Sequence, residues 1–429
     1  MEELLNFDFS TEKPSIIKVI GVGGGGGNAV THMYKEGIRD VNFVLCNTDI
    51  QALLKSEVPV KLQLGKEITK GLGSGNRPDI AEKAALESTE EIRSLLSDGT
   101  KMVFVTAGMG GGTGTGAAPI VAEIAKSLDI LTIGIVTIPF LFEKENKIIQ
   151  ALNGVEKMSR SVDALLVINN EKLREVYPDL HIYNAFKKAD DTLLVAAQSI
   201  AEIITLPGHV NLDFADVNTT LKAGGVAVMS SGWGEGECRL TKAIESALNS
   251  PLLNNNDIFN AKKILLNIYS SENNPIMMEE MSELHAFMSK FSKDIEVIWG
   301  AAADDSLEEK AKITILATGF SIDTIPMMTD KKRFEWERMT AEERADQEAK
   351  ESAAEETKEK NTRSIIRYYG EKGLQVLIGI EQPQPYIFTF EQLNDNDIIE
   401  EVLNTPAYKR DSKKITKLAA EKRAQLSIF

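Results

Sequence analysis

The chain has 429 residues, of which 43% are hydrophobic and 26% are charged, and its formal net charge is −16. This size and composition predict a globular protein with two cored domains and additional segments. The acidic balance argues against broad affinity for nucleic acid or anionic lipid, because basic surfaces recruit such partners. Cys46 and Cys238 lie far apart and predict neither a disulfide framework nor a zinc site. The sequence shows no signal peptide and no apolar run near the roughly 18 residues of a membrane span, so we expect a cytoplasmic protein without membrane insertion.

Short β-branched apolar segments alternate with helical patterns between residue 16 and about residue 170. The predicted strands are "IIKVIGV" (16–22), "NFVLCN" (42–47), "KMVFVTA" (101–107), "LTIGIVTI" (131–138) and "ALLVINN" (164–170). Helical periodicity covers 74–96 and 118–128. This alternation predicts a Rossmann-like α/β domain, in which helices cover a mostly parallel sheet.

A continuous helical pattern follows at 184–205 and predicts a helix about 33 Å long. Pro207 and Gly208 end it. Beyond it, predicted strands at 224–233, 261–270, 295–303 and 312–320, with helices near 241–250 and 276–291, indicate a smaller α+β domain. The long helix can therefore join two domains and carry a loop at its far end.

The composition changes after about residue 323. Residues 330–363 contain eleven acidic and nine basic residues and predict a charged helix or a solvated linker. The strand-like segments within 373–390 remain without an interpretation. The predicted organisation is an N-terminal extension (1–15), a nucleotide-binding domain (16–183), a central helix (184–206), a C-terminal α+β domain (207–322), a charged linker (323–395) and a partner-binding tail (396–429).

The segment "GMGGGTGTGAAP" (108–119) lies between a predicted strand and a predicted helix. Its backbone amides should converge on the helix N-terminus, where the helix dipole favours an anion and missing side chains permit close approach. Thr113 and Thr115 can add hydroxyl donors. The segment lacks the Gly-Lys-Ser/Thr ending of a Walker loop, and the alternative is a merely flexible glycine loop.

A second glycine run, "GVGGGGGNAV" (21–30), follows the first predicted strand and satisfies the G-x-G-x-x-G dinucleotide pattern. A dinucleotide enzyme would need only one phosphate loop and an acid at the end of the second strand, where the sequence has "NTD" (47–49). Two glycine runs at different strand–helix junctions favour a triphosphate that is held from two sides.

The heptapeptide "GGGTGTG" (110–116) matches the signature of the tubulin superfamily. The segments "NTD", "GLGSGNRPDIAEKAA", "PFLFE" and "NLDFADV" follow the order seen in bacterial cell-division members of the tubulin/FtsZ superfamily, and the resemblance covers 16 to about 320. It implies a GTPase that uses GTP, GDP and Mg²⁺, polymerises head to tail and forms the midcell division ring in the cytoplasm. The alternatives are an NAD-dependent oxidoreductase and a nucleotide-binding scaffold without turnover.

The resemblance also implies roles for individual residues. Asn28 would lie near the base and ribose, Asn47 and the loop around Gly73 would close over the phosphate end, and Glu143 would contact the ribose. Lys147 stands where the family usually has arginine, so the positive charge is kept but the bidentate fork is lost. The residues expected at the phosphates are Gly23, Gly24, Gly25, Gly26, Gly110, Gly111, Gly112, Thr113, Gly114, Thr115 and Gly116.

Two residues of the long helix resemble the base-binding residues of the family. Phe186 would stack on guanine, and Asp190 would accept from guanine N1–H and the 2-amino group, donors that adenine lacks. Asp190 could instead be a solvated helix residue, and Asp191 is an adjacent competitor.

The segment "NLDFADV" (211–217) follows the long helix, too far from this chain's own phosphate loops to reach them. In the family this loop enters the nucleotide pocket of the next subunit, so Asp213 and Asp216 are the candidates for polarising the attacking water, with Asn211 beside them. The alternative is that these acids cap a helix or form a turn.

Two further features concern partners and metals. Residues 402–410 resemble the family's tail peptide, and an apolar stripe within 398–403 would dock onto membrane-tethering and regulatory division proteins. Seven basic and two acidic residues within 409–429 give that segment a net charge of 7 − 2 = +5. The four histidines show no metal-ligand spacing, and no protein-bound metal is expected.

Overall fold

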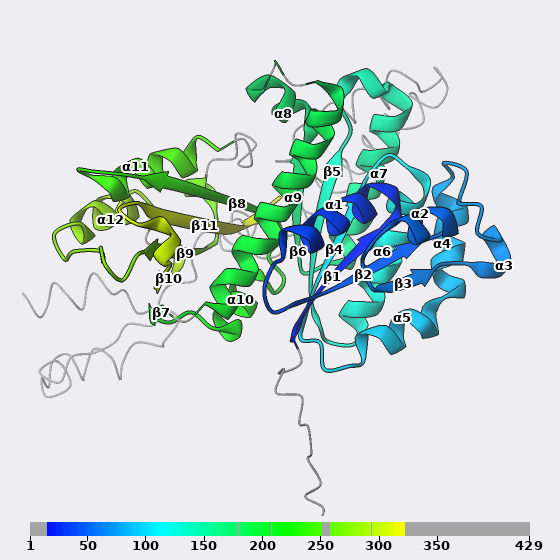
Figure 1. Cartoon of the computed structure of the whole chain (residues 1–429), viewed down its shortest axis with the longest axis horizontal. Coiled ribbons are helices and arrows are strands. Elements are labelled where there is room, and N and C mark those ends of the chain that lie inside the picture. The colour runs from blue at the N-terminus through cyan, green and yellow to red at the C-terminus, as the bar shows by residue number, and fades with distance from the viewer. Residues whose placement is uncertain are drawn as a thin grey trace, which may run out of the picture. The chain divides into compact units, whose positions relative to one another are not determined.

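The computed structural model describes residues 15–177, 179, 181–206, 208–250, 258–292 and 294–321. Within them, eleven strands form one sheet in the order β3-β2-β1-β4-β5-β6-β8-β11-β9-β10-β7 (Figure 1). The predicted linker and tail, the segments within 373–390 and the N-terminal extension up to residue 14 lie outside the described residues.

The N-terminal part of the sheet is parallel from β3 to β6. Most of its strand residues are buried, as expected for a sheet covered by helices on both faces. Its strands are β1 (Ile17–Val22), β2 (Val41–Asn47), β3 (Val60–Gln63), β4 (Met102–Gly108), β5 (Leu131–Ile138) and β6 (Ala164–Asn169).

The helices of this part are amphipathic and pack on both faces of the sheet. They are α1 (Gly23–Glu36), α2 (Ile50–Lys55), α3 (Lys66–Thr69), α4 (Pro78–Glu87), α5 (Thr89–Leu96), α6 (Gly112–Ser127), α7 (Glu145–Ser161) and α8 (Asn170–Val176). The alternating sequence pattern correctly predicts this parallel sheet with helices on both faces.

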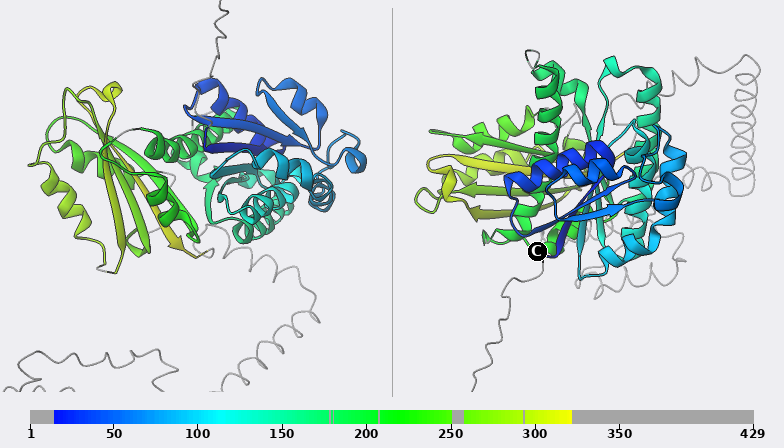
Figure 2. Two further views of the ribbon diagram at one scale, coloured as in Figure 1. Left: turned by 90° about the horizontal axis from the view of Figure 1, so that it is seen from below. Right: turned by 45° about the vertical axis from the view of Figure 1, so that its right-hand side comes forward.

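Helix α9 (Ile182–Thr205) has 24 residues and is about 36 Å long. It runs from the neighbourhood of α8 to that of α10 (Phe214–Leu221), with the two parts of the sheet on either side of it (Figures 1 and 2). The C-terminal part mixes parallel and antiparallel pairs, as predicted for an α+β unit. Its elements are β7 (Gly208–Val210), β8 (Gly225–Gly234), α11 (Arg239–Leu248), β9 (Lys263–Ser270), α12 (Met281–Met288), β10 (Glu296–Ala303) and β11 (Ala311–Phe320).

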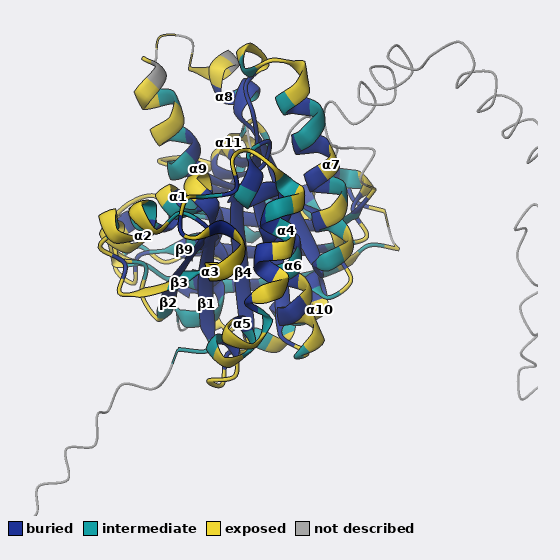
Figure 3. Ribbon diagram, turned by 90° about the vertical axis from the view of Figure 1, so that its right-hand side faces the viewer, coloured by how far each residue is buried: buried dark blue, intermediate teal, exposed yellow. Residues whose placement is uncertain are grey.

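The two parts share one sheet because β6 pairs with the start of β8 over three residues, 164–166 with 225–227. Successive strand residues alternate between two apolar cores: Val19 belongs to the core under α1 and α9, and Ile20 to the core under α6. Figure 3 shows the buried strands inside and the exposed faces of the helices outside.

The structure differs from the sequence-based expectations at several elements. The short strands β3 and β7 were not predicted, since four and three residues give too little periodicity. The single helix expected within 74–96 is two helices, α4 and α5, which meet at Ser88. The first glycine run forms the first turns of α1, and the second enters the first turn of α6, which begins at Gly112, six residues earlier than expected.

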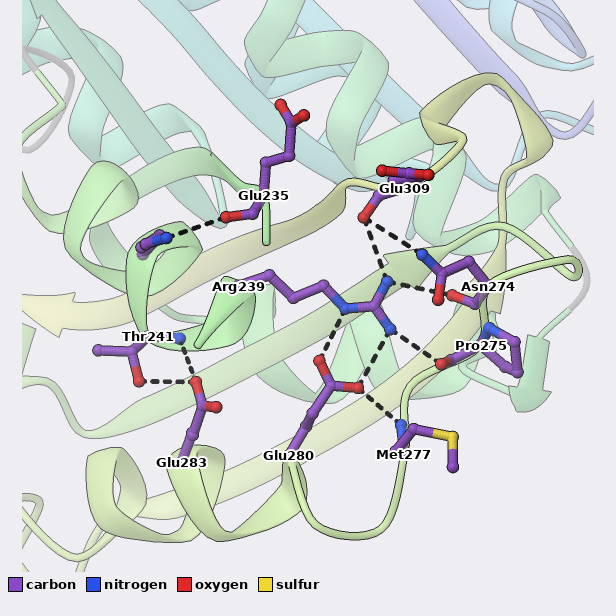
Figure 4. Close-up of polar contacts among 10 residues, drawn as sticks. Glu235, Arg239, Thr241, Asn274, Pro275, Met277, Glu280, Glu283 and Glu309 are labelled. Carbon is purple, nitrogen blue, oxygen red and sulfur yellow. Dashed lines mark hydrogen bonds and ion pairs between the residues drawn. The ribbon is translucent and has the colours of Figure 1, made fainter. Parts of the chain in front are cut away.

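Arg239 organises the loops of the C-terminal part (Figure 4). Its buried guanidinium donates to both oxygens of Glu280 at 2.7 and 3.1 Å. It also donates to the carbonyls of Asn274, Pro275 and Glu309 at 3.2, 2.8 and 3.3 Å. One side chain at the start of α11 therefore holds the loops that follow β9 and β10.

We expect Arg239→Met to lower the free energy of unfolding by about 3 kcal/mol, because it leaves Glu280 and three carbonyls without their donor. Arg239→Lys should recover part of the loss, since lysine keeps the charge but not the fork. The neighbouring guanidinium holds the pKa of Glu280 below its usual value, so this contribution is present above pH about 4.5 and is lost as pH falls through the lowered pKa.

Urea unfolding followed at pH 7 and pH 4 measures these effects. Arg93→Met is the matched control, because Arg93 makes an exposed pair with Glu90 and should change stability by less than about 0.5 kcal/mol. Equal effects of the Arg239 and Arg93 substitutions would contradict the role of Arg239.

Candidate functional site

Two helix N-termini without side-chain caps meet at the carboxyl edge of the parallel sheet. Neither α1, which begins at Gly23, nor α6, which begins at Gly112, has a capping side chain or an acidic residue in its first turn. The two termini touch, since a Cβ atom on Gly23 would lie 2.8 Å from the amide nitrogen of Gly114. First-turn amides have no acceptor within their own helix, so these two termini form a site for an anion.

The glycines of this site fall into two groups. A Cβ atom on Gly26 would lie 2.2 Å from the carbonyl oxygen of Thr106, and one on Gly114 would lie 2.5 Å from that of Gly108, so these glycines permit close packing of α1 and α6 on β4. Gly24 and Gly111 have neither a positive φ nor a neighbour within 4 Å of a Cβ atom. The folded chain alone does not require glycine at these two positions, and a side chain there would occupy the space in front of the amides.

Four further glycines of the two runs pack closely against neighbouring atoms. Gly25 would place a Cβ atom 3.2 Å from Gly108, while Gly110 has φ +97° and packs against Lys147. Gly112 lies under the loop that contains Ser74, and Gly116 packs against the carbonyl of Pro78.

The loop that contains Gly73 lies beside the first turn of α6. Ser74 Oγ is 3.2 Å from Thr113 Oγ1, which is 2.7 Å from Thr48 Oγ1, so three hydroxyl groups gather at this helix terminus. Gly73 has φ +85° and donates its amide to the carbonyl of Thr48. Thr115, in contrast, is buried, and its hydroxyl accepts from the amide of Gly110, so it braces the glycine run.

A cavity of about 250 Å³ opens beside the two helix termini. Residues from α1, α7 and α9 that are remote in the sequence face it together. Its lining includes Gly25, Asn28, Gly111, Glu143, Lys147, Asn170, Phe186 and Asp190. Asn28 also faces a second cavity of about 430 Å³, whose lining includes Gly23, Gly24 and Asn47.

Phe186 lines the smaller cavity and belongs to a cluster of three aromatic side chains. Phe186 is 42% exposed and packs edge-on against the buried Phe140, with ring centroids 5.3 Å apart. Phe142 stacks on the other side of Phe140 at 5.1 Å. The exposed face of Phe186 is thus available to a planar ligand.

Asp190 faces the same cavity one helical turn after Phe186. Burial raises its pKa to about 7, with a further increase from the neighbouring Asp191 and a partial offset from His32. Asp191 is held elsewhere: its Oδ1 lies 2.7 Å from Nε2 of His32 on α1.

Glu143 and Lys147 form an ion pair across the first turn of α7. Glu143 also accepts from the amide of Phe140 at 3.0 Å, and its side chain is largely buried. The Lys147 side chain lines the cavity and is 41% exposed. The positive charge expected near the anion site is therefore present, but it is partly neutralised.

The structure adds Asn170, which the sequence analysis did not single out. Asn170 is 5% exposed and faces the smaller cavity, and its Oδ1 has no hydrogen-bond partner within the part of the chain that the structure describes. Asn169 beside it caps α8 by accepting from the amide of Glu171, so only the second asparagine is left for a ligand. The sequence feature that could have identified Asn170 is the asparagine pair at the carboxyl end of β6, because open α/β sheets bind ligands at the carboxyl ends of their strands.

The acids of the segment 211–217 cap a helix. Asp213 Oδ1 accepts from the amides of Ala215 and Asp216 at 2.7 and 3.2 Å, and Asp216 Oδ2 accepts from the amide of Asp213 at 3.0 Å. This reciprocal pair is a capping box at the start of α10. Among the described residues, the second oxygen of each carboxylate has no hydrogen-bond partner.

Asn211 lies just before this cap, exposed, with its Oδ1 3.2 Å from the amide of Gly208. Phe186 and Asp190 of the cavity belong to the first turns of α9, whereas the acids cap α10, which lies near the other end of α9 (Figure 1). One chain therefore does not bring Asp213 and Asp216 to its own anion site.

The described part of the chain contains no group of three or more His, Cys, Asp or Glu side chains that could hold a metal ion. Nor does any helix there have the length and apolar character needed to cross a bilayer.

Three family models match the chain. Residues 16–178 match the GTPase domain of the Tubulin/FtsZ family, residues 225–321 match the C-terminal domain of the FtsZ family, and residues 381–425 match a further FtsZ C-terminal model. The first two models correspond to the two parts of the sheet.

Known proteins resemble the chain over most of their length. Cell division protein FtsZ of Porphyromonas gingivalis is 50% identical over 415 residues, which are 95% of this chain and 88% of that protein. The Aquifex aeolicus protein is 44% identical over 75% of this chain and 85% of its own length. The structure of an empty FtsZ dimer from M. jannaschii has a TM-score of 0.66 and 39% identity, and the alignment covers 72% of this chain and 90% of that one.

The two groups of glycines predict opposite effects of substitution by alanine. Gly24→Ala and Gly111→Ala should leave the free energy of unfolding unchanged or slightly raised, yet weaken nucleotide triphosphate binding at least tenfold, because a methyl group intrudes in front of the amides. Gly26→Ala and Gly114→Ala should destabilise the fold by about 1–3 kcal/mol, because the methyl group meets a carbonyl oxygen. Urea unfolding and equilibrium binding separate the groups; weakened folding without weakened binding in Gly111→Ala would refute the assignment.

Proposed function

This chain belongs to the FtsZ family of tubulin-like GTPases, and we propose that its paired helix N-termini hold the phosphates of GTP, which is hydrolysed at a junction between two subunits. As a member of this family the chain is a GTPase that binds GTP and GDP, self-associates into filaments and serves cell division. The oxidoreductase and scaffold alternatives receive no support, because the matches described above are to a family of GTPases.

The phosphates lie on the first-turn amides of α1 and α6. The observation that carries this proposal is that Gly24 and Gly111 leave open space in front of two uncapped helix termini. Thr113 donates its hydroxyl there, and Lys147 supplies a positive charge. Asn47 and the loop around Gly73 close the phosphate end, while Thr115 holds the glycine run in shape.

The base and ribose occupy the smaller cavity. Guanine stacks on the exposed face of Phe186 and donates N1–H and its 2-amino group to Asp190. Asn170, whose buried Oδ1 has no partner, contacts the base from the end of β6. Asn28 and Glu143 bind near the ribose.

Mg²⁺ neutralises the β- and γ-phosphates when it is bound. Among the described residues no cluster of acids could hold it alone, so phosphate oxygens and water supply most of its ligands. The hydroxyls of Thr48, Ser74 and Thr113 fit a position beside such a hydrated ion.

The water-orienting carboxylates come from the next subunit. Asp213 and Asp216 stand at the far end of α9 from the nucleotide, and each has one oxygen that is not used in the capping box. In a head-to-tail filament these oxygens orient the attacking water at the neighbour's γ-phosphate, and Asn211 lines the same junction. The predicted boundaries place the phosphate-binding residues in 16–183, Phe186 and Asp190 in the central helix 184–206, and the acids in 207–322.

The segment 398–410 recruits membrane-tethering and regulatory division proteins to the filament. Support comes from the family match of residues 381–425 and from the apolar stripe of the tail sequence. The protein acts in the cytoplasm at the midcell ring, without nucleic-acid binding and without inserting itself into the membrane.

Hydrolysis across a junction predicts that Asp216→Asn binds GTP and assembles normally but loses turnover by about 10²–10⁴-fold. The amide oxygen can still accept from the Asp213 amide, so α10 keeps its cap while the charge is lost. Asp216→Ala should add a loss of about 1 kcal/mol in stability. Phosphate release, sedimentation and urea unfolding measure the three properties, and a loss of turnover in Asp216→Ala alone would assign the acid to the cap only.

Mixing Asp216→Asn with Gly111→Ala should restore part of the activity. Some junctions then pair an intact phosphate site with an intact acidic loop, and the wild type should show a steeper than linear dependence of rate on protein concentration. Linear dependence together with no rescue would mean that one chain contains the whole active site.

The raised pKa of Asp190 predicts that GDP binds about tenfold more weakly at pH 6 than at pH 8. Guanine needs an ionised acceptor, and burial holds the pKa of Asp190 at about 7, so the affinity rises as pH increases through 7. Asp190→Asn should flatten this dependence. Competition binding with a fluorescent nucleotide is the measurement, and an unchanged slope in that variant would exclude Asp190 as the titrating contact.

A further inference from the structure

A contact between α1 and α9 lies directly beside the base cavity. Nε2 of His32 is 2.7 Å from Oδ1 of Asp191, and the His32 side chain is 16% exposed. Nδ1 of the same ring lies 3.9 Å from Glu36, a more exposed and more distant partner. The short contact to Asp191 is therefore the polar link that joins the two helices at this point.

The neighbouring acids of α9 have different surroundings. Asp190 lines the cavity together with Phe186, Ala189 and Leu193, which recur at the spacing of one helical face. Asp191 is not among the residues that line it, and its carboxylate is taken up by His32. Successive residues of a helix point about 100° apart, so holding Asp191 against α1 fixes the direction of Asp190.

We propose that His32 is a positioning residue for guanine: by holding Asp191 against α1, it sets the rotation of the first turns of α9 so that Asp190 meets the base edge. The inference rests on the proposed GTP site, and within that site it makes His32 a determinant of base specificity. His32 does not touch the nucleotide in this scheme. It selects which of two adjacent carboxylates reads the base, and it fixes the separation of α1 from α9 on the side where Asn28 also faces the cavity.

Base discrimination tests the role of His32 better than affinity alone. ITP lacks the 2-amino group of GTP, so the ratio of GTP to ITP affinity reports the contact with Asp190. His32→Ala should lower this ratio about 3- to 10-fold, because a misdirected carboxylate no longer engages both donors. His32→Gln, which can still donate to Asp191, should restore much of it. Thermal unfolding of each variant without nucleotide shows whether the variant is folded.

A double-mutant cycle tests the pair. Asp191→Ala should lower the ratio as His32→Ala does, and the double variant should lose no more than either single one. Arg93→Ala is the control, because Arg93 lines neither of the two cavities, pairs with Glu90 on the exposed surface and should leave the ratio unchanged.

Substituting each acid by asparagine identifies which of the two side chains hydrogen-bonds the base. Asp190→Asn should shift preference from GTP toward XTP, whose 2-oxo group needs a donor, while Asp191→Asn should keep the preference for GTP. A shift toward XTP in Asp191→Asn, or an unchanged GTP to ITP ratio in His32→Ala, would overturn the inference. If the wild type itself did not prefer GTP over ATP, the proposed function would fail instead, so the two failures are distinguishable.

Discussion

Unsatisfied amides at the first turns of α1 and α6 are the constraint on which the nucleotide half of this molecule depends. Both helices start without a capping side chain, and their termini are in contact, so two sets of donors and two dipole ends face one region. An anion bound at both helix N-termini accepts the hydrogen bonds that capping side chains would otherwise accept. The glycines have two separate effects. Gly26 and Gly114 let the helices approach β4 closely. Gly24 and Gly111 leave the space in front of the amides empty.

Helix α9 separates the two sets of functional groups, and this separation explains why the protein must assemble. Its first turns carry Phe186 and Asp190 at the smaller cavity, and its last turn, about 28 Å along the helix from Phe186, leads to the acidic segment. A single rigid helix cannot bring both of its ends to one nucleotide. A complete set of groups therefore requires two copies in a head-to-tail arrangement, which agrees with filament formation in the family.

The sequence predicted the long, strongly periodic elements and the glycine-lined site, because repeated apolar spacing and glycine runs are local signals. It did not predict β3, β7 or the break at Ser88, which depend on pairing partners or on one residue of local geometry. Within the site, Asn170 and the His32–Asp191 contact were missed for another reason. These residues are brought to the cavity only by the tertiary packing of α1, β6 and α9, which no local sequence pattern reports. Asp190 and Asp191 could not be told apart by spacing alone, since adjacent helix residues differ only in direction.

The capping box at α10 shows that the structural and catalytic interpretations of Asp213 and Asp216 are compatible. A carboxylate has two oxygens, and here one oxygen of each acid is fixed by backbone amides while the other remains available. The cap thereby orients the free oxygen without a further side chain, and it lowers the entropy that would be lost when a neighbour's nucleotide is engaged. In the proposed mechanism, the same bonds that begin the helix thus preorganise the carboxylates for the next subunit.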